Sequence, residues 1–526
     1  DRRVWYGGAA AVLALLLVLA AWSLTRAGGD SSTSRGTGDA PVKTASVYEQ
    51  ELATAEATLA QNSQDFAALL GRGQALLGLG RYQEAVDALT AALSVRTDDL
   101  VALLARAEAS AGAGEWDLVI DDTSRILALD KTSLPALLLR ARAAREQGDV
   151  AAAERDYATA VAAHGDDPVV YRSRAEHYLM QDQLTAAHAD LQKALALDDQ
   201  DPDTWVMLGT AYITWSPTRE QQPDRAIDAF TRALLIDPQN VPAFVNRGRT
   251  YLDFTSDPER ARADLSRAIE IGPATAQMYE IRSRTTDEPS GRLADLDRAV
   301  AVDTNEPVPY VWRAEHYFRH NDIARAIVDY SAAIERAPED WEYYVERSNL
   351  YLVAGKYDEA AADAQQVLDG QPESASGHHA LARVRFVQGD YEQALAEANL
   401  AVDTAEVWDR PLALAQRGRI YVRLDRPDEA LRDLDEADKL EQATETALFG
   451  RAELLIARRE YDAALTLLDD WSGFGSPYGA GYVLRAQIYL AQGTPRKAGD
   501  DLTRAHELVL YPDEVRQATA LAEQIG

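Results

Sequence analysis

The stretch that decides the fold is RAEHYFRHNDIARAIVDYSAAIERAPEDWEYYVERSNLYLVAGKYDEAAAD, residues 313–363. Three residue types in its first part return 34 positions later. The returning pairs are Arg313/Arg347, Tyr317/Tyr351 and Asp329/Asp363. A fixed period of this length is typical of a chain built from one supersecondary unit used many times. Such a unit cannot bury its apolar face alone, so neighbouring units must stack to form a core.

The same period runs outward in both directions. Alanines seven residues apart recur from Ala85/Ala92 to Ala498/Ala505, and a small residue such as Gly73 stands twelve positions before the first alanine. Small residues let two antiparallel helices approach closely. Turn signals such as Gly355-Lys-Tyr lie between the predicted helices, and prolines follow many second helices. The pattern therefore predicts about thirteen helical hairpins.

This pattern resembles the tetratricopeptide repeat family from about residue 66 to 512. The resemblance implies an all-α fold, a right-handed α-solenoid of helix-turn-helix repeats that binds proteins, needs no cofactor and is not an enzyme. The predicted segments are a half repeat (47–65), repeats 1–6 (66–275), a degenerate seventh repeat with a possible kink (276–306), repeats 8–13 (307–512) and a capping helix (513–526).

The N-terminal residues follow a different pattern. Val4–Thr25 contains 22 uncharged residues, which as a helix would span about 33 Å, enough to cross a bilayer once. Trp5, Tyr6 and Trp22 lie near its ends, as interfacial aromatic residues do. We expect a single transmembrane helix between a short flank (1–3) and a Gly/Ser-rich linker (26–46). A cleaved signal peptide is the alternative.

The side of the membrane is less constrained by the sequence. Arginines flank the apolar stretch on both sides, so their distribution sets no strong orientation. The flexible linker favours a repeat region outside the cytoplasm over one on the cytoplasmic face. Because the chain begins with Asp1, we also expect a further segment upstream.

Composition excludes several classes of function. The formal net charge of −32, without a basic stripe, argues against nucleic-acid binding. The chain has no cysteine, which excludes disulfides, thiolate catalysis and cysteine-ligated zinc. No phosphate-binding loop, zinc-protease motif or nucleophile elbow occurs. His316 and His320 are four residues apart on a predicted helix, but a lone pair of this kind is rarely a metal site. We predict no metal, no cofactor and no catalytic residue.

Most repeats carry an arginine at position 7 and an aspartate at position 23. The pairs are Arg106/Asp122, Arg140/Asp156, Arg174/Asp190, Arg247/Asp264, Arg313/Asp329, Arg347/Asp363, Arg417/Asp433 and Arg485/Asp501. We predict a bidentate hydrogen bond between the two helices of each repeat. A row of arginines that binds a ligand is the alternative, but each arginine has an acid encoded in the same repeat.

In the resembling family, partners often bind a concave surface lined by the first helices, where positions 5 and 9 face inward. We predict that partner-binding residues occupy these two positions, apolar at the fifth and of mixed charge at the ninth. They are Leu104, Leu138, Val206, Val245, Val311 and Val345, with Arg142, Arg249, Glu315, Arg383 and Arg419. The apolar residues could instead pack between neighbouring repeats. The carboxylate clamp of chaperone-binding members is not reproduced as a set.

These observations predict a membrane-anchored scaffold that holds one or more proteins of unknown identity along its concave surface. Two alternatives remain open at this point. The chain could be the regulatory region of a larger protein, such as a receptor-like kinase whose catalytic domain lies upstream. It could also be a subunit of an envelope secretion or export complex.

Overall fold

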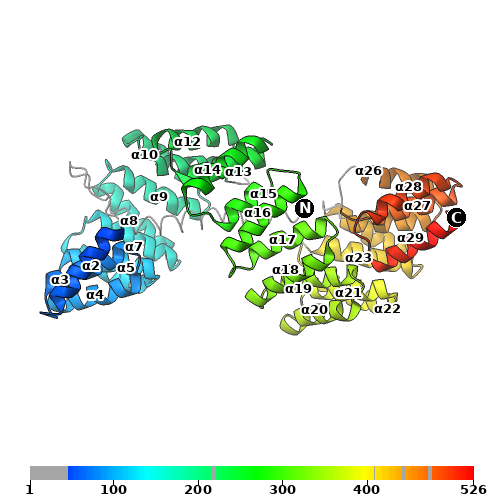
Figure 1. Cartoon of the computed structure of the whole chain (residues 1–526), viewed down its shortest axis with the longest axis horizontal. Coiled ribbons are helices and arrows are strands. Elements are labelled where there is room, and N and C mark those ends of the chain that lie inside the picture. The colour runs from blue at the N-terminus through cyan, green and yellow to red at the C-terminus, as the bar shows by residue number, and fades with distance from the viewer. Residues whose placement is uncertain (1–44, 215–220, 408, 441–444, 472–476, 526) are drawn as a thin grey trace. The chain divides into compact units, whose positions relative to one another are not determined.

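The computed structural model describes residues 45–214, 221–407, 409–440, 445–471 and 477–525, and these residues form 28 helices. The predicted all-α solenoid of helix pairs is confirmed. Two compact bodies divide the chain, an N-terminal body up to Pro273 and a C-terminal body from Ala274 onward. Each body is a succession of antiparallel helical hairpins (Figure 1).

The N-terminal body contains a leading helix and six complete repeats. Its helices are α2 (Ala45–Leu59), α3 (Phe66–Gly78), α4 (Tyr82–Val95), α5 (Leu100–Ala113), α6 (Trp116–Leu129), α7 (Leu134–Glu146), α8 (Val150–Ala163), α9 (Pro168–Met180), α10 (Leu184–Leu197), α11 (Pro202–Ile213), α12 (Pro223–Ile236), α13 (Val241–Phe254) and α14 (Pro258–Ile271).

The C-terminal body contains seven helix pairs and a last single helix. Its helices are α15 (Ala276–Ser283), α16 (Pro289–Val302), α17 (Val308–Arg319), α18 (Ile323–Arg336), α19 (Trp341–Val353), α20 (Tyr357–Gly370), α21 (Ala375–Gln388), α22 (Tyr391–Thr404), α23 (Arg410–Arg423), α24 (Pro427–Lys439), α25 (Glu445–Ala457), α26 (Tyr461–Trp471), α27 (Ala480–Ala491), α28 (Pro495–His506) and α29 (Pro512–Ile525). The degenerate seventh repeat is α15 and α16, whose first helix has only 8 residues. The kink predicted there stays a prediction.

Local sequence signals start and end the helices of each repeat. In the second repeat, the Asp99 carboxylate accepts a hydrogen bond from the Ala102 backbone N–H (3.0 Å), which satisfies a donor left free at the start of α5. Gly114 ends that helix with a φ of 77°, a left-handed conformation that glycine adopts without a steric penalty. The chain therefore turns sharply into α6.

Small residues set how closely the two helices of a repeat pack. Ala85 and Ala92 of α4 are fully buried. A Cβ atom added to Gly73 of α3 would lie only 2.4 Å from Cγ of Leu89. The periodic small residues thus allow close contact, and leucines such as Leu89 fill the space between helices.

First helices line the inner face of each stack. Successive first helices contact one another directly, as α3 does with α5 and α5 with α7. Among the helices that the structure describes, successive second helices make no contact of comparable extent. A curved stack brings its inner elements closer together than its outer ones. The inner face is therefore formed by α3, α5, α7, α9, α11 and α13 in one body and by α17, α19, α21, α23, α25 and α27 in the other.

The predicted membrane segment lies outside the described residues, since Val4–Thr25 falls within residues 1–44. Within the part of the chain that the structure does describe, no helix is both long enough and apolar enough to cross a membrane.

Candidate partner-binding surface

The repeated arginine and aspartate meet in every pair named above. In each, Nε and Nη2 of the arginine donate to the two carboxylate oxygens of the aspartate at 2.6–2.9 Å. Because both charges are paired and bidentate, the arrangement can be retained away from water.

The aspartates of these pairs lie in the interior of the repeats and not on the partner-binding surface. Asp363 of α20 is only 6% exposed, and both of its carboxylate oxygens accept from Arg347 of α19 at 2.8 Å. The other seven aspartates of the set are buried in the same way, namely Asp122, Asp156, Asp190, Asp264, Asp329, Asp433 and Asp501. A buried carboxylate whose two oxygens are already engaged by an arginine offers nothing to a partner, so these residues are structural.

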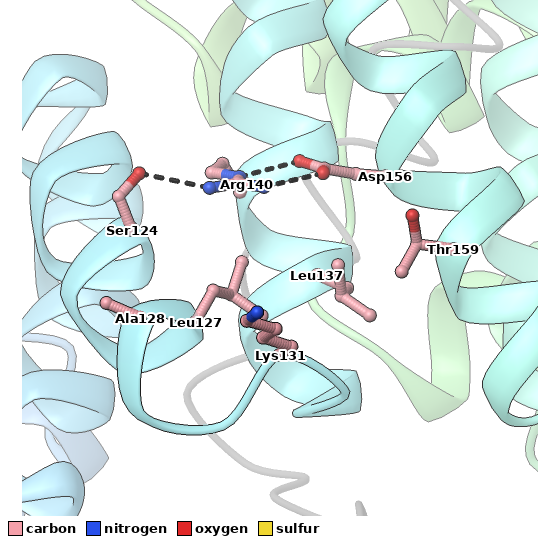
Figure 2. A pocket seen from close by; sticks show the side chains of 8 residues that line it. All are labelled: Ser124, Leu127, Ala128, Lys131, Leu137, Arg140, Asp156 and Thr159. Atoms are coloured by element: carbon pink, nitrogen blue, oxygen red, sulfur yellow. Dashed lines mark hydrogen bonds and ion pairs between the residues drawn. The ribbon is translucent and has the colours of Figure 1, made fainter.

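A third contact extends this pair to the preceding repeat. In seven of these pairs, Nη1 of the arginine also donates a hydrogen bond of 2.8–3.2 Å to a polar side chain on the second helix of the preceding repeat. In a regular repeat, this acceptor is the residue at position 25. These acceptors are Thr90, Ser124, Thr231, Asp297, Ser331, Asn399 and Asp469. Figure 2 shows Arg140 between Ser124 of α6 and Asp156 of α8, beside the pocket that they border. We call this three-helix unit the arginine staple.

The staple varies where the repeat pattern varies. In the degenerate repeat, Arg282 and Asp295 form the same bidentate contact at 2.6 and 3.0 Å, although only 13 residues separate them. The sequence analysis missed this pair because the shortened α15 changes the spacing. In repeat 10, which lacks the arginine, His378 Nδ1 lies 2.8 Å from the Glu397 carboxylate. The interhelical polar contact is thus kept with different residues.

Most of the apolar side chains predicted to bind a partner instead pack against other side chains of the repeats. Val206 and Val245 are only 2% and 6% exposed, which leaves them no surface for a partner. The other four, Leu104, Leu138, Val311 and Val345, are half-buried and pack against core clusters at the junctions of repeats. The fifth position therefore serves mainly to join repeats.

The ninth positions of the first helices form a polar row along the inner face. In the C-terminal body, Arg383 donates to Asn349 at 2.9 Å, and Arg419 binds Glu453 at 2.8 Å. Each of these contacts joins the ninth residues of two successive repeats. Glu315 is half-buried in the same row. In the N-terminal body, Arg249 contacts Asp253 of its own helix at 3.3 Å.

The C-terminal body covers its own inner face with two segments, residues 477–479 before α27 and the residues that lead into α29. Backbone hydrogen bonds of 2.8 Å join Val509 to Pro477 and Gly479, which places Tyr478 beside the segment that precedes α29. The Tyr478 ring meets Phe318 of α17 edge-on at 5.8 Å and stacks with Tyr511 at 6.2 Å.

Tyr511 reaches the polar row itself. Its hydroxyl accepts a hydrogen bond from Arg383, whose guanidinium lies 4.8 Å from the centre of the tyrosine ring. The ring packs against a cluster containing Leu352 and Val384, against which Tyr357 also packs. Gln517 of α29 donates to Gln487 of α27 at 2.9 Å, so α29 continues the cover along the row. We call residues 508–525 the C-terminal strap.

Two acidic residues of the strap lie in an unfavourable environment. Burial raises the pKa of Glu514 to about 7, and the neighbouring Asp513 adds to the effect. Asp513 Oδ1 is buried and accepts no hydrogen bond from any residue that the structure describes. Burial also opposes the ionisation of Glu453, yet Arg419 and Arg423 together hold its pKa below the ordinary value. Arg419 is already paired with Glu453, so the strap carboxylates compete for its charge.

The N-terminal body lacks a comparable cover among its described residues. Its Arg142 is the ninth residue of repeat 3, and its guanidinium lies 5.7 Å from the centre of the Trp116 ring. Arg142 Nε is buried and has no acceptor among the described residues. Burial raises the pKa of Glu108, the ninth residue of repeat 2. Arg145 contacts Glu146 and Glu176 at 2.8 and 3.3 Å.

His316 and His320 lie together, with ring centres 4.2 Å apart. Burial lowers the pKa of His316 to about 4, and the adjacent His320 contributes to this shift. His320 Nδ1 lies 2.8 Å from the His316 carbonyl oxygen, so that nitrogen is engaged with the backbone. Within the residues described, no group of three potential metal ligands occurs.

Comparison with known proteins gives the family. A model of the tetratricopeptide repeat family matches residues 52–100, 138–202, 313–375, 345–411 and 416–480, more than half of the chain. Among curated proteins, superkiller complex protein 3 of Homo sapiens is 24% identical over 162 residues, and tetratricopeptide repeat protein 37 of Xenopus laevis is 26% identical over 166. Each match covers 29% of this chain and only 10% of the relative.

Solved structures include similar helical stacks. Yeast Tom70 is 18% identical, with a TM-score of 0.39, over 88% of this chain and 98% of its own. A tetratricopeptide repeat protein from Parabacteroides merdae is 17% identical, with a TM-score of 0.37, over 54% of this chain and 99% of its own. Members of the family are typically non-catalytic. The chain belongs to the tetratricopeptide repeat family and is a scaffold for protein–protein interactions.

Proposed function

We propose that this chain holds a protein partner on the inner face of its N-terminal body while an N-terminal helix tethers it to a membrane. The observation that carries the proposal is the difference in cover between the two inner faces. In the C-terminal body, Tyr511 and α29 already occupy the polar row. In the N-terminal body, Arg142 lies in the corresponding row and contacts Trp116, without such a segment among the described residues.

The partner segment that fits this face is extended or amphipathic. The row offers charges of both signs, Glu108 and Arg142, on a base of half-buried leucines, Leu104 and Leu138. A segment that binds there can use apolar side chains for affinity and charged ones for register.

Site-specific photocrosslinking tests this surface. A photoreactive residue at Leu138, on the inner face, should capture the partner in cells. The matched control places the same residue at Arg155, which is exposed on the second helix α8. Equal capture from both positions, or capture from Arg155 alone, would show that the inner face is not the binding surface.

The tether rests on the uncharged stretch Val4–Thr25, which is long enough for one crossing. Carbonate extraction of membranes should leave the full chain in the pellet and release a variant without residues 1–44. We further propose that the repeats lie outside the cytoplasm. Protease added to intact cells with a permeable outer layer should then degrade them, whereas a protected repeat region would place them on the cytoplasmic side.

A further inference from the structure

The strap provides an example of a segment bound to this repeat surface. It presents one aromatic residue, Tyr511, followed by two acids, Asp513 and Glu514. The aromatic ring is held by a ninth-position arginine, Arg383, and packs against the same apolar cluster as Tyr357, which stands at position 17 of the preceding repeat. Arg383 contributes both a hydrogen bond to the hydroxyl and a contact with the ring face.

The N-terminal body has the same residue types, an arginine and an aromatic residue, at the same repeat positions. Arg142 is the ninth residue of repeat 3, as Arg383 is of repeat 10, and Trp116 stands at position 17 of the preceding repeat, as Tyr357 does. The guanidinium of Arg142 and the Trp116 ring are in contact. The buried Nε of Arg142 has no acceptor in the described part of the chain, so the described residues leave the hydrogen-bonding capacity of this guanidinium incompletely used.

We propose that the surface formed by Arg142 and Trp116 binds a partner segment with a tyrosine closely followed by acidic residues, the chemistry that the strap presents to Arg383. The tyrosine ring lies against Trp116, and the hydroxyl or a following carboxylate accepts hydrogen bonds from Arg142. This inference rests on the proposed function, because it names the chemistry of the partner for the same inner face.

A synthetic peptide with the sequence LVLYPDEV, residues 508–515, is the probe. Labelled with a fluorophore and titrated with the full chain, it should bind, and Arg142→Ala should weaken the affinity roughly 10- to 100-fold, as expected for loss of a charged hydrogen bond. Trp116→Ala should weaken it as well, whereas the exposed control Arg155→Ala should not. Arg142→Lys keeps the positive charge but loses the bidentate donors of the guanidinium. Its affinity for the peptide should therefore lie between those of the unchanged chain and of Arg142→Ala. Circular dichroism establishes that each variant is folded.

The position of the bound peptide is read with a benzophenone in place of its tyrosine. Crosslinks to the region of Trp116 and Arg142 support the proposal. Crosslinks confined to the region of Tyr357 and Arg383 would mean that the peptide exchanges with the strap, and they would overturn it. No binding up to about 1 mM would overturn it too.

Peptide variants test the stated chemistry. Replacing the tyrosine with alanine, or the two acids with their amides, should each reduce binding. Tighter binding of a peptide with lysines in place of the acids would identify Glu108 as the anchor and overturn the proposal. In either negative case, partner capture from Leu138 in the crosslinking experiment would leave the proposed function standing.

Discussion

The two bodies of this chain are built from the same repeat but differ in what covers their inner faces. Both are held together by the arginine staple, and both present a polar row at the ninth positions of their first helices. In the C-terminal body the chain's own strap covers that row, whereas in the N-terminal body Arg142 retains a buried nitrogen without an acceptor among described residues. The staple is therefore a feature of the fold that the two bodies share, whereas the ninth positions are where the two bodies differ.

The largest expected effect tests whether the staple is equally important in both bodies. Asp122→Ala in the N-terminal body and Asp363→Ala in the C-terminal body each leave a largely buried arginine without a carboxylate, since the side chains of Arg106 and Arg347 are only 12% and 17% exposed and their third contacts are to hydroxyl groups. We expect each to destabilise its body by about 3–5 kcal/mol. Amide exchange during a denaturant titration follows each body separately and measures the decrease in its free energy of unfolding.

The matched control removes both members of a pair. Arg347→Leu with Asp363→Leu should cost less than Asp363→Ala alone, because no uncompensated charge remains. A double variant as unstable as the single one would mean that the staple acts through packing. A large loss of stability in only one body would contradict the prediction that the staple is equally important in both.

The staple is also the part of the structure that could be predicted in most detail from the sequence. The Arg–Asp pairs could be predicted because they recur with the repeat, and a period fixes which side chains face each other. Their third contact was missed because position 25 varies among residues such as Thr90, Ser124 and Asn399, which share only an oxygen acceptor. Periodicity did not distinguish buried Val206 from half-buried Leu104, since both are apolar at the same position and the depth of each depends on the neighbouring repeat.

The strap could not be predicted from the repeat pattern. Tyr511 and Arg383 are 128 residues apart, and the strap follows the last repeat, so no period links them. The polar composition of Asp513–Ile525 is equally typical of a capping helix that faces water. Only the curvature of the C-terminal body, which follows from the packing of many side chains, brings this segment to α21.

A smaller effect sharpens the difference between the covered and uncovered rows through pH. The pKa of Glu514 is about 7 in the folded chain, above its ordinary value of 4.5. The folded state therefore holds this proton more tightly than the unfolded state does. The contribution of protonated Glu514 to the free energy of unfolding is complete below about pH 4.5 and is lost as the pH rises through 7.

Amide exchange in α29 measures this dependence. Between about pH 5.5 and pH 7.5 the protection of α29, corrected for intrinsic rates, should fall by roughly 2 kcal/mol. Glu514→Gln should remove this fall, while α7 in the N-terminal body should show none of it. The groups facing Glu514 are Asp513, Arg419 and Glu453. Because Glu453 titrates below its ordinary value, it stays ionised throughout this range. Protection that rises with pH would contradict the assignment.

The smallest effect concerns the third contact of the staple, which one of the Arg–Asp pairs of the N-terminal body lacks. Arg174 makes the bidentate contact with Asp190, but position 25 of the preceding repeat is Ala158, which has no acceptor. The corresponding residue one repeat earlier is Ser124, which accepts from Arg140 at 3.2 Å.

Ala158→Ser should restore the contact and stabilise the body by about 0.5–1 kcal/mol, and Ser124→Ala should destabilise it by a similar amount. Chemical denaturation of the two single variants and of their combination measures both changes, which should cancel because the sites belong to different arginines. If Ala158→Ser gives no gain while Ser124→Ala costs stability, the third contact depends on the local geometry of each repeat and cannot be transferred between repeats.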